Sequence, residues 1–219
     1  MVESDSSAVT TAWQIERSCY FLRMSGSSRI ELPKGDRTRA RILDEAVDLA
    51  SVQGLGGLTI GPLAERLGLS KSGLFAHFQS KEALQVETLQ RVAARFRAEV
   101  TEPLRAIENR ADRLRAFFNR WIAWLDAPGL TGGCPILSAA IEFDDVPGAV
   151  RDAAARQLGE LQSLIGKFAR AAKPDGDAEA LTAAVMGLAM SHLVRARLLG
   201  EHKARAVTLR AFESLMKAS

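Results

Sequence analysis

Hydroxyl and cationic side chains gather in one short segment of the chain, where their types and spacing could serve contacts with a nucleic acid. Ser70, Lys71 and Ser72 are consecutive, and Gly73 follows without a side chain. A cation and a hydroxyl at the start of a slim helix can reach base edges in the major groove of DNA. The free backbone N–H groups at that helix start also favour a phosphate. Lys81, at the start of the next predicted helix, could hold the DNA backbone on the other side.

Three further candidates for DNA contact lie close to this segment. Phe75 and His77 fall on the face of the predicted helix opposite its apolar face. Thr59 lies directly before the helix predicted over residues 60–67. Its main predicted role is to cap that helix, and it could also contact a phosphate. A less specific interpretation stays open for the polar candidates, because the lysines and serines could be ordinary solvated residues and His77 could pack partly in the core.

The elements that would position these side chains are two short helices joined by a tight turn. Thr59 is a predicted N-cap for a helix over residues 60–67, Gly68 ends that helix, and Ser70 caps a second helix over residues 71–78. Two apolar residues at i and i+4 of the second helix share one face, which can pack on the first helix. This is the helix-turn-helix arrangement, which places its second helix in the major groove.

Helical spacing of apolar residues continues through the rest of the chain, and the alternation typical of strands is nearly absent. The predicted fold class is therefore all-α, with nine helices separated by glycine and proline clusters. The predicted helices span residues 36–53, 60–67, 71–78, 81–100, 110–126, 134–143, 147–172, 176–199 and 202–217.

Three parts are predicted along the chain. Residues 1–33 are rich in serine and threonine and lack a capped periodic segment, so they are predicted to form a disordered arm. The alternative is that the true start is Met24 and residues 1–23 are not translated in the cell. Residues 34–80 are predicted to form the helix-turn-helix domain. Residues 81–219 are predicted to form a second, larger helical domain.

The composition of the chain excludes several classes of protein. Hydrophobic residues make up 47% and charged residues 25% of the chain, as in an ordinary soluble protein. No apolar run approaches the ~18–20 residues of a membrane span.

The two cysteines have no metal-ligand spacing, which argues for a reducing cytoplasm and against a metal site. No catalytic motif or phosphate loop is present, so neither an enzyme nor a cofactor is predicted. The carboxylates of Glu142, Asp144 and Asp145 are best explained as a solvated helix end.

Many of these residues agree in order and spacing with the DNA-binding signature of the TetR family of repressors, which the segment from about residue 36 to residue 90 resembles. Phe75 replaces the usual tyrosine, so it cannot donate the hydroxyl that would normally meet a phosphate. The resemblance implies a homodimer whose larger domain binds an effector. The residues that carry it are Thr59, Leu63, Ala64, Gly68, Leu69, Ser70, Lys71, Leu74, Phe75, His77, Phe78, Ser80, Lys81 and Glu82.

An effector site, as the resemblance implies, needs a mostly apolar lining. Phe117, Trp121 and Cys134 are the first candidates for that lining, and Met186 and Met190 are weaker ones. The first three could equally be ordinary core, and core is the better interpretation of the two methionines. Cys134 could also be a redox sensor, but no adjacent cation or partner cysteine would lower the pKa of its thiol, so burial is the better interpretation.

The last two predicted helices, over about residues 176–217, are apolar on two sides. Such a helix must be buried on two sides, so one face could meet a second subunit. A dimer is also needed because two recognition helices, spaced by one DNA turn of about 34–36 Å, can select a pseudo-palindromic operator.

The predicted function is a homodimeric, sequence-specific DNA-binding regulator in the cytoplasm. We expect a repressor that a small apolar or amphipathic effector releases from its operator. The alternative is a helix-turn-helix regulator without such an effector, controlled by a protein partner or by redox state. A cavity beside Trp121 would favour the first, and a filled core there would favour the second.

Overall fold

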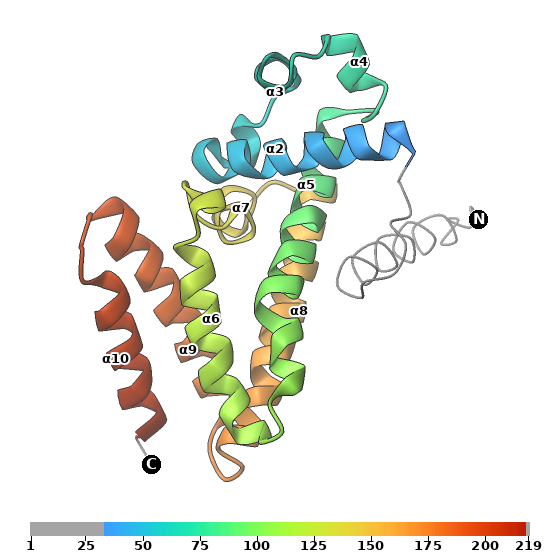
Figure 1. Cartoon of the computed structure of the whole chain (residues 1–219). Coiled ribbons are helices and arrows are strands. Elements are labelled where there is room, and N and C mark those ends of the chain that lie inside the picture. The colour runs from blue at the N-terminus through green and yellow to red at the C-terminus, as the bar shows by residue number, and fades with distance from the viewer. Residues whose placement is uncertain (1–32, 218–219) are drawn as a thin grey trace. The chain divides into compact units, whose positions relative to one another are not determined.

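Nine α-helices and no strands make up the part of the chain that the structure describes, residues 33–217 (Figure 1). The structure is a computed structural model. It confirms the predicted all-α fold. The arm expected for residues 1–33 lies, except for its last residue, outside the described residues. The account below concerns the unit formed by residues 40–219.

The helices follow the predicted order, and most of their bounds differ from the predicted ones by a few residues. The second helix of the helix-turn-helix ends early, because His77 N–H bonds the Leu74 carbonyl at 3.0 Å and tightens the last turn. The helices are α2 (Lys34–Gly57), α3 (Ile60–Leu67), α4 (Lys71–Phe75), α5 (Lys81–Phe96), α6 (Arg113–Leu125), α7 (Pro135–Glu142), α8 (Ala149–Ala172), α9 (Ala178–Leu193) and α10 (Ala204–Lys217).

Two of the long helices continue in other helical forms. After α5 the chain makes a π-helical turn (Arg97–Thr101) and then a 3₁₀ turn (Glu102–Ala106). Pro103 lacks a backbone N–H, so the α-helical bonding pattern cannot run through it. α9 likewise continues as a π-helical turn (Val194–Leu198).

A small core joins α2, α3, α4 and the start of α5. Leu63 and Leu74 have no exposed surface, and Ala64 and Phe78 are almost completely buried. The small side chain of Ala64 lets α3 and α4 approach closely, as the spacing of these residues predicts. The core therefore fixes the direction in which α4 presents its opposite face.

A larger, separate core joins helices α5 to α10. Aromatic side chains of α6 occupy its centre, and the rings of Phe118 and Phe212 stack with 4.2 Å between their centroids. Val47, Ala50 and Leu55 of α2 also belong to this core. One helix, α2, thus contributes buried side chains to both cores.

Candidate DNA-binding surface and ligand cavity

The start of α4 is closed by its own serine. Ser70 has an extended backbone (φ −72°, ψ 151°), and its Oγ accepts a hydrogen bond from Gly73 N–H at 3.0 Å. The hydroxyls of Ser70 and Ser72 lie 3.2 Å apart. Lys71 and Ser72 are exposed. The first turn of α4 therefore presents a cation and a hydroxyl to solvent, the pair that the sequence offers for DNA contact.

The other candidates for DNA contact surround this turn. Phe75 is 51% exposed, so a large aromatic side chain faces solvent although it could have been buried. His77 is half-buried, with its ring centroid 6.4 Å from that of Phe78. Thr59 is the exposed N-cap of α3, but its side chain makes no capping hydrogen bond. The Thr59 hydroxyl thus lacks the capping role that the sequence predicts for it first.

Lys81 has a contact that the sequence does not reveal. Its Nζ donates a hydrogen bond to the carbonyl of Gly56 at 2.7 Å, near the end of α2. The neighbouring carbonyl, of Leu55, accepts a hydrogen bond from Gln85 Nε2 at 2.7 Å. Two side chains of α5 therefore satisfy carbonyls that a helix end leaves without partners.

Glu142, the last residue of α7, bonds the same segment from the other side. Its carboxylate accepts the backbone N–H of Leu55 at 2.9 Å and that of Gly56 at 2.7 Å. The interpretation of Glu142 as part of a solvated helix end is therefore incomplete. A signal for these contacts is the glycine-rich end of α2, because Gly54 has φ 74° and interrupts the helix, which leaves backbone groups in need of partners.

The loop between α6 and α7 lies against the backbone of α2. Gly132 N–H donates a hydrogen bond to Ser51 Oγ at 3.2 Å. A β-carbon on Gly132 would lie 1.5 Å from the carbonyl oxygen of Ser51 and 2.3 Å from the α-carbon of Val52. Only glycine fits this contact without movement of a backbone segment. Figure 1 shows α7 beside α2, as this contact requires.

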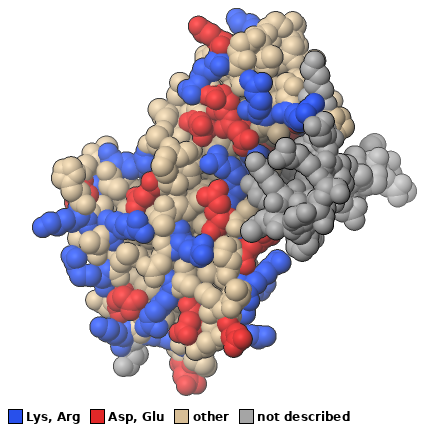
Figure 2. Space-filling model, in the orientation of Figure 1, with Lys and Arg blue, Asp and Glu red and all other residues tan. Residues whose placement is uncertain are grey.

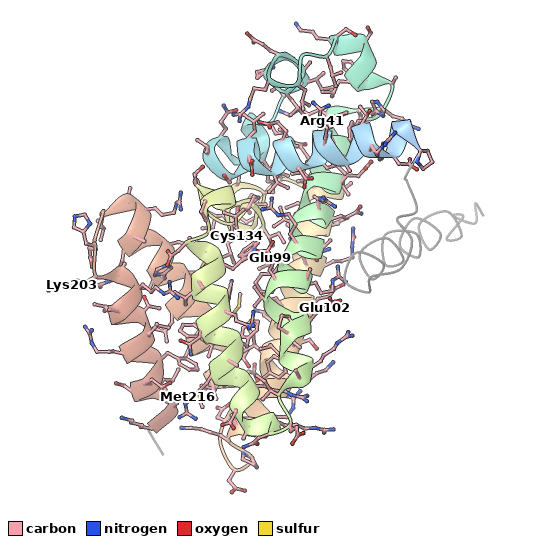
Figure 3. The ribbon with its side chains drawn as sticks, in the orientation of Figure 1. Arg41, Glu99, Glu102, Cys134, Lys203 and Met216 are labelled. Atoms are coloured by element: carbon pink, nitrogen blue, oxygen red, sulfur yellow. The ribbon has the colours of Figure 1, made fainter. Side chains whose placement is uncertain are left out.

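A cavity of about 750 Å³ lies among α5, the turns that follow it, α6, α7 and α8. This volume is within the ~300–1,000 Å³ range usual for small-molecule sites. Its deep wall is apolar and includes Trp121, Cys134 and Leu137, which are 1%, 4% and 2% exposed. Figure 3 shows Cys134 where α7 begins.

Two of the five residues expected to line an effector site, Trp121 and Cys134, line this cavity. Phe117 does not belong to the lining, because its ring lies behind those of Trp121 and Phe168, at centroid distances of 5.5 and 5.8 Å. Met186 and Met190 pack half-buried against the larger core, and α9 contributes no residue to the lining that the structure describes. The cavity is also lined by residues of α8, none of which the sequence analysis predicts as part of an effector site.

The surroundings of Cys134 disfavour its thiolate. Burial raises its pKa to about 11, although hydrogen bonds from the backbone of Leu137 and Ile136 act in the opposite direction. The thiolate is the nucleophile, so a thiol that stays protonated at neutral pH is a poor redox sensor. The redox alternative therefore gains no support from Cys134, and Cys19 lies outside the described residues.

Among the described residues, no cluster of three or more histidine, cysteine or acidic side chains could hold a metal ion. No described helix is both long and apolar enough to cross a membrane.

Comparisons with known proteins agree with this architecture. The family model described as "Bacterial regulatory proteins, tetR family" matches residues 42–88, and the one described as "Tetracyclin repressor-like, C-terminal domain" matches residues 111–212. A search of curated proteins finds no match.

Solved structures show the same fold. A TetR transcriptional regulator from Chloroflexus aurantiacus is 26% identical, with a TM-score of 0.77 over 86% of this chain and 98% of that chain. A TetR-family regulator from Cytophaga hutchinsonii is 21% identical, with a TM-score of 0.72 over 85% and 96% of the two chains. One from Streptomyces coelicolor is 20% identical, with a TM-score of 0.73 over 82% and 95%.

Proposed function

The chain belongs to the TetR family of bacterial transcriptional regulators, which are not enzymes, and we propose that it is a homodimeric cytoplasmic repressor released from its operator by a small molecule. One observation carries the proposal, which is that α7 contacts both functional parts of the chain. The first residues of α7 line the cavity, and its last residue, Glu142, bonds the end of α2. α2 in turn belongs to the core that holds the helix-turn-helix.

The DNA-binding part of the proposal assigns roles to the exposed residues of the helix-turn-helix. Lys71 and Ser72 contact bases or phosphates from the first turn of α4, and Phe75 and His77 pack against the DNA backbone. Ser70 and Gly73 shape the start of α4. Thr59 and Lys81 flank it, and Lys81 also holds the end of α2.

The dimer is supported by faces that α9 leaves uncovered. Val185 and Ala189 are buried in the core of this chain, whereas Gly187 and Ser191, on another side of the helix, are exposed. A β-carbon at Gly187 would meet nothing within 4 Å, so a second helix has room to approach. Leu198, just beyond α9, is 80% exposed. If the exposed residues Gly187, Ser191 and Leu198 were buried against their copies in a second subunit, the two chains would form an isologous contact over about residues 176–217.

The release mechanism follows from the two ends of α7. A ligand that contacts Cys134, Ile136 and Leu137 can shift α7, and Glu142 transmits that shift to the N–H groups of Leu55 and Gly56. The two α4 helices of a dimer then no longer match the spacing of the half-sites. By linkage, operator DNA must weaken ligand binding by the same factor.

Footprinting on the DNA that flanks the protein's own coding region tests the DNA-binding part. We expect one or more protected pseudo-palindromes, with half-sites about 34–36 Å apart, and an affinity that falls steeply as salt rises. Analytical ultracentrifugation of the free protein should give a dimer. The absence of any sequence-selective, salt-sensitive binding to a random DNA pool would contradict the proposal.

The coupling through Glu142 is tested by Glu142→Ala, with Asp145→Ala as control. Loss of the carboxylate frees two backbone N–H groups, so we expect faster amide exchange at Leu55 and Gly56 and weaker operator binding. Because the bonds are partly exposed, the stability lost is about 1 kcal/mol, or a Tm decrease of about 2–4 °C. Asp145 is exposed and contributes no side-chain bond that the structure shows, so its variant should behave as wild type. Unchanged amide exchange in the Glu142 variant would rule out this coupling.

A further inference from the structure

We propose that the cavity takes an amphipathic organic anion, with an apolar body and a carboxylate at one end. The inference rests on the proposed function only in making this anion the effector; the preference of the cavity for an anion stands on the lining alone. Two features of that lining support the inference. Its interior is apolar, and at its other end basic residues outnumber acidic ones by more than the composition of the chain would give.

The apolar interior suits a hydrocarbon or aromatic body. Phe96, Trp121 and Trp124 line it, and the ring centroids of Phe96 and Trp124 lie 5.0 Å apart with the rings nearly perpendicular. Trp121 and Trp124 are 1% and 4% exposed, so this end of the cavity is deep within the larger core. A ligand body here would be removed from water, which stabilises its binding in proportion to its apolar area.

The other end of the cavity reaches solvent and is cationic. Among the described residues that line it, four are basic and one is acidic, although the whole chain has 29 basic and 26 acidic residues. Figure 2 shows the two signs interspersed over the visible face of the molecule, so the excess at the cavity is local. The basic residues are Arg97, Arg105, Arg113 and Lys167, and the acidic one is Glu160.

These cations come from separate segments that the fold brings to one cavity. Arg105 lies on the 3₁₀ turn after α5, Arg113 begins α6, and Lys167 lies on α8. Arg105 and Lys167 are exposed, which fits the mouth of the cavity. Cations around a cleft with low-dielectric walls focus a positive potential into it, which attracts anions.

Arg113 is held in place for such a contact. Its Nε and Nη2 both donate to the carbonyl of Ile107, at 3.0 and 2.9 Å. Its Nη1 bonds no acceptor that the structure shows among the described residues. A guanidinium fixed in this way can bond a carboxylate with little further loss of side-chain freedom. A neutral ligand could accept hydrogen bonds from these groups but would gain no attraction between charges, and a cationic ligand would be repelled.

Calorimetric titration of the full-length protein tests the charge preference with matched ligands. Decanoate, decan-1-ol and decylammonium share one apolar chain and differ in the charge of the head group, and each is used below the concentration at which it aggregates. We expect decanoate to bind at least tenfold more tightly than either of the others. The preference should fall as salt rises, because part of the cationic end is exposed.

Variants locate the site. Lys167→Gln combined with Arg105→Gln should weaken decanoate binding about tenfold and leave the affinity for decan-1-ol unchanged. Arg156→Gln, which removes a charge from the same helix outside the lining, should change neither affinity. Equal binding of decanoate and decan-1-ol, or a decanoate affinity that the double variant does not alter, would overturn the inference.

The same ligands separate this inference from the proposed function. If decanoate binds with the expected preference but leaves operator binding unchanged, the anion site stands and release by this class of ligand fails. If no anion preference appears and wild-type protein still protects its operator, the inference fails and the DNA-binding function stands.

Discussion

Operator affinity is expected to fall about a hundredfold when Lys71 is replaced by alanine. Lys71 is exposed on the first turn of α4, the element that a helix-turn-helix places in the major groove. One contact to a base or phosphate is worth about 1–3 kcal/mol, and a dimer loses it twice. Each tenfold loss of affinity corresponds to about 1.4 kcal/mol, so a hundredfold decrease lies in the lower half of the expected range.

The salt dependence of the same variant identifies the partner of Lys71. If its ammonium meets phosphate, the slope of log affinity against log salt decreases and all sequences are weakened alike. If it meets a base, specificity relaxes at one position of each half-site. Arg156→Ala serves as control, since Arg156 is exposed on α8, outside both the helix-turn-helix and the proposed dimer contact, and its loss removes the same charge. A Lys71 variant that is folded and binds the operator as wild type does would show that α4 is not the recognition helix.

A second large effect is expected from Gly132→Ala, this time on stability. The added β-carbon would lie 1.5 and 1.9 Å from the oxygen and carbon of the Ser51 carbonyl, and these backbone atoms cannot rotate away. Either α2 or the loop before α7 must move. We expect a loss of more than about 4 kcal/mol, which places this variant among the most destabilising single substitutions. Urea unfolding followed by circular dichroism measures it.

Gly129→Ala is the matched control in the same loop. A β-carbon there would come within 2.8 Å of the Arg95 guanidinium, the far end of a flexible side chain that can move. We expect a change of less than about 1 kcal/mol, which is ordinary for a surface substitution. A Gly132 variant with the urea midpoint of wild type would show that α2 and the α6–α7 loop do not approach as closely as described.

Local signals were enough to predict the helix-turn-helix. Ser70 is a predicted N-cap, and in the structure its hydroxyl accepts the backbone N–H of Gly73, three residues further on. Ser80 accepts the N–H of Ala83 in the same way at the start of α5. Gly68 is predicted to end α3 and has φ 65°, the left-handed conformation that glycine adopts without strain. The bonds that define caps and turns join residues close in sequence, so residue types at short spacing determine them.

One helix end and one cap bond differ from the sequence prediction, and they show what local sequence patterns do not determine. Thr59 occupies the predicted N-cap position without the predicted side-chain bond, and α4 ends at Phe75. The early end of α4 goes with the tight turn that His77 N–H closes on the Leu74 carbonyl, and nothing in the structure explains the missing bond of Thr59. The periodicity of apolar residues predicts which face of a helix is buried, but it does not predict the residue at which the helix ends.

Phe117 and Trp121 share the apolar face of one helix, so the sequence alone determines that both are buried. Only the tertiary structure decides that Trp121 faces the cavity while Phe117 lies behind it, because the difference depends on where α8 crosses. Likewise, residue type gives Glu142 a carboxylate, but its bonds to Leu55 and Gly56 join segments up to 87 residues apart. Spacing along one helix describes one surface, whereas a cavity and a junction exist only between surfaces, which the packing of several helices brings together.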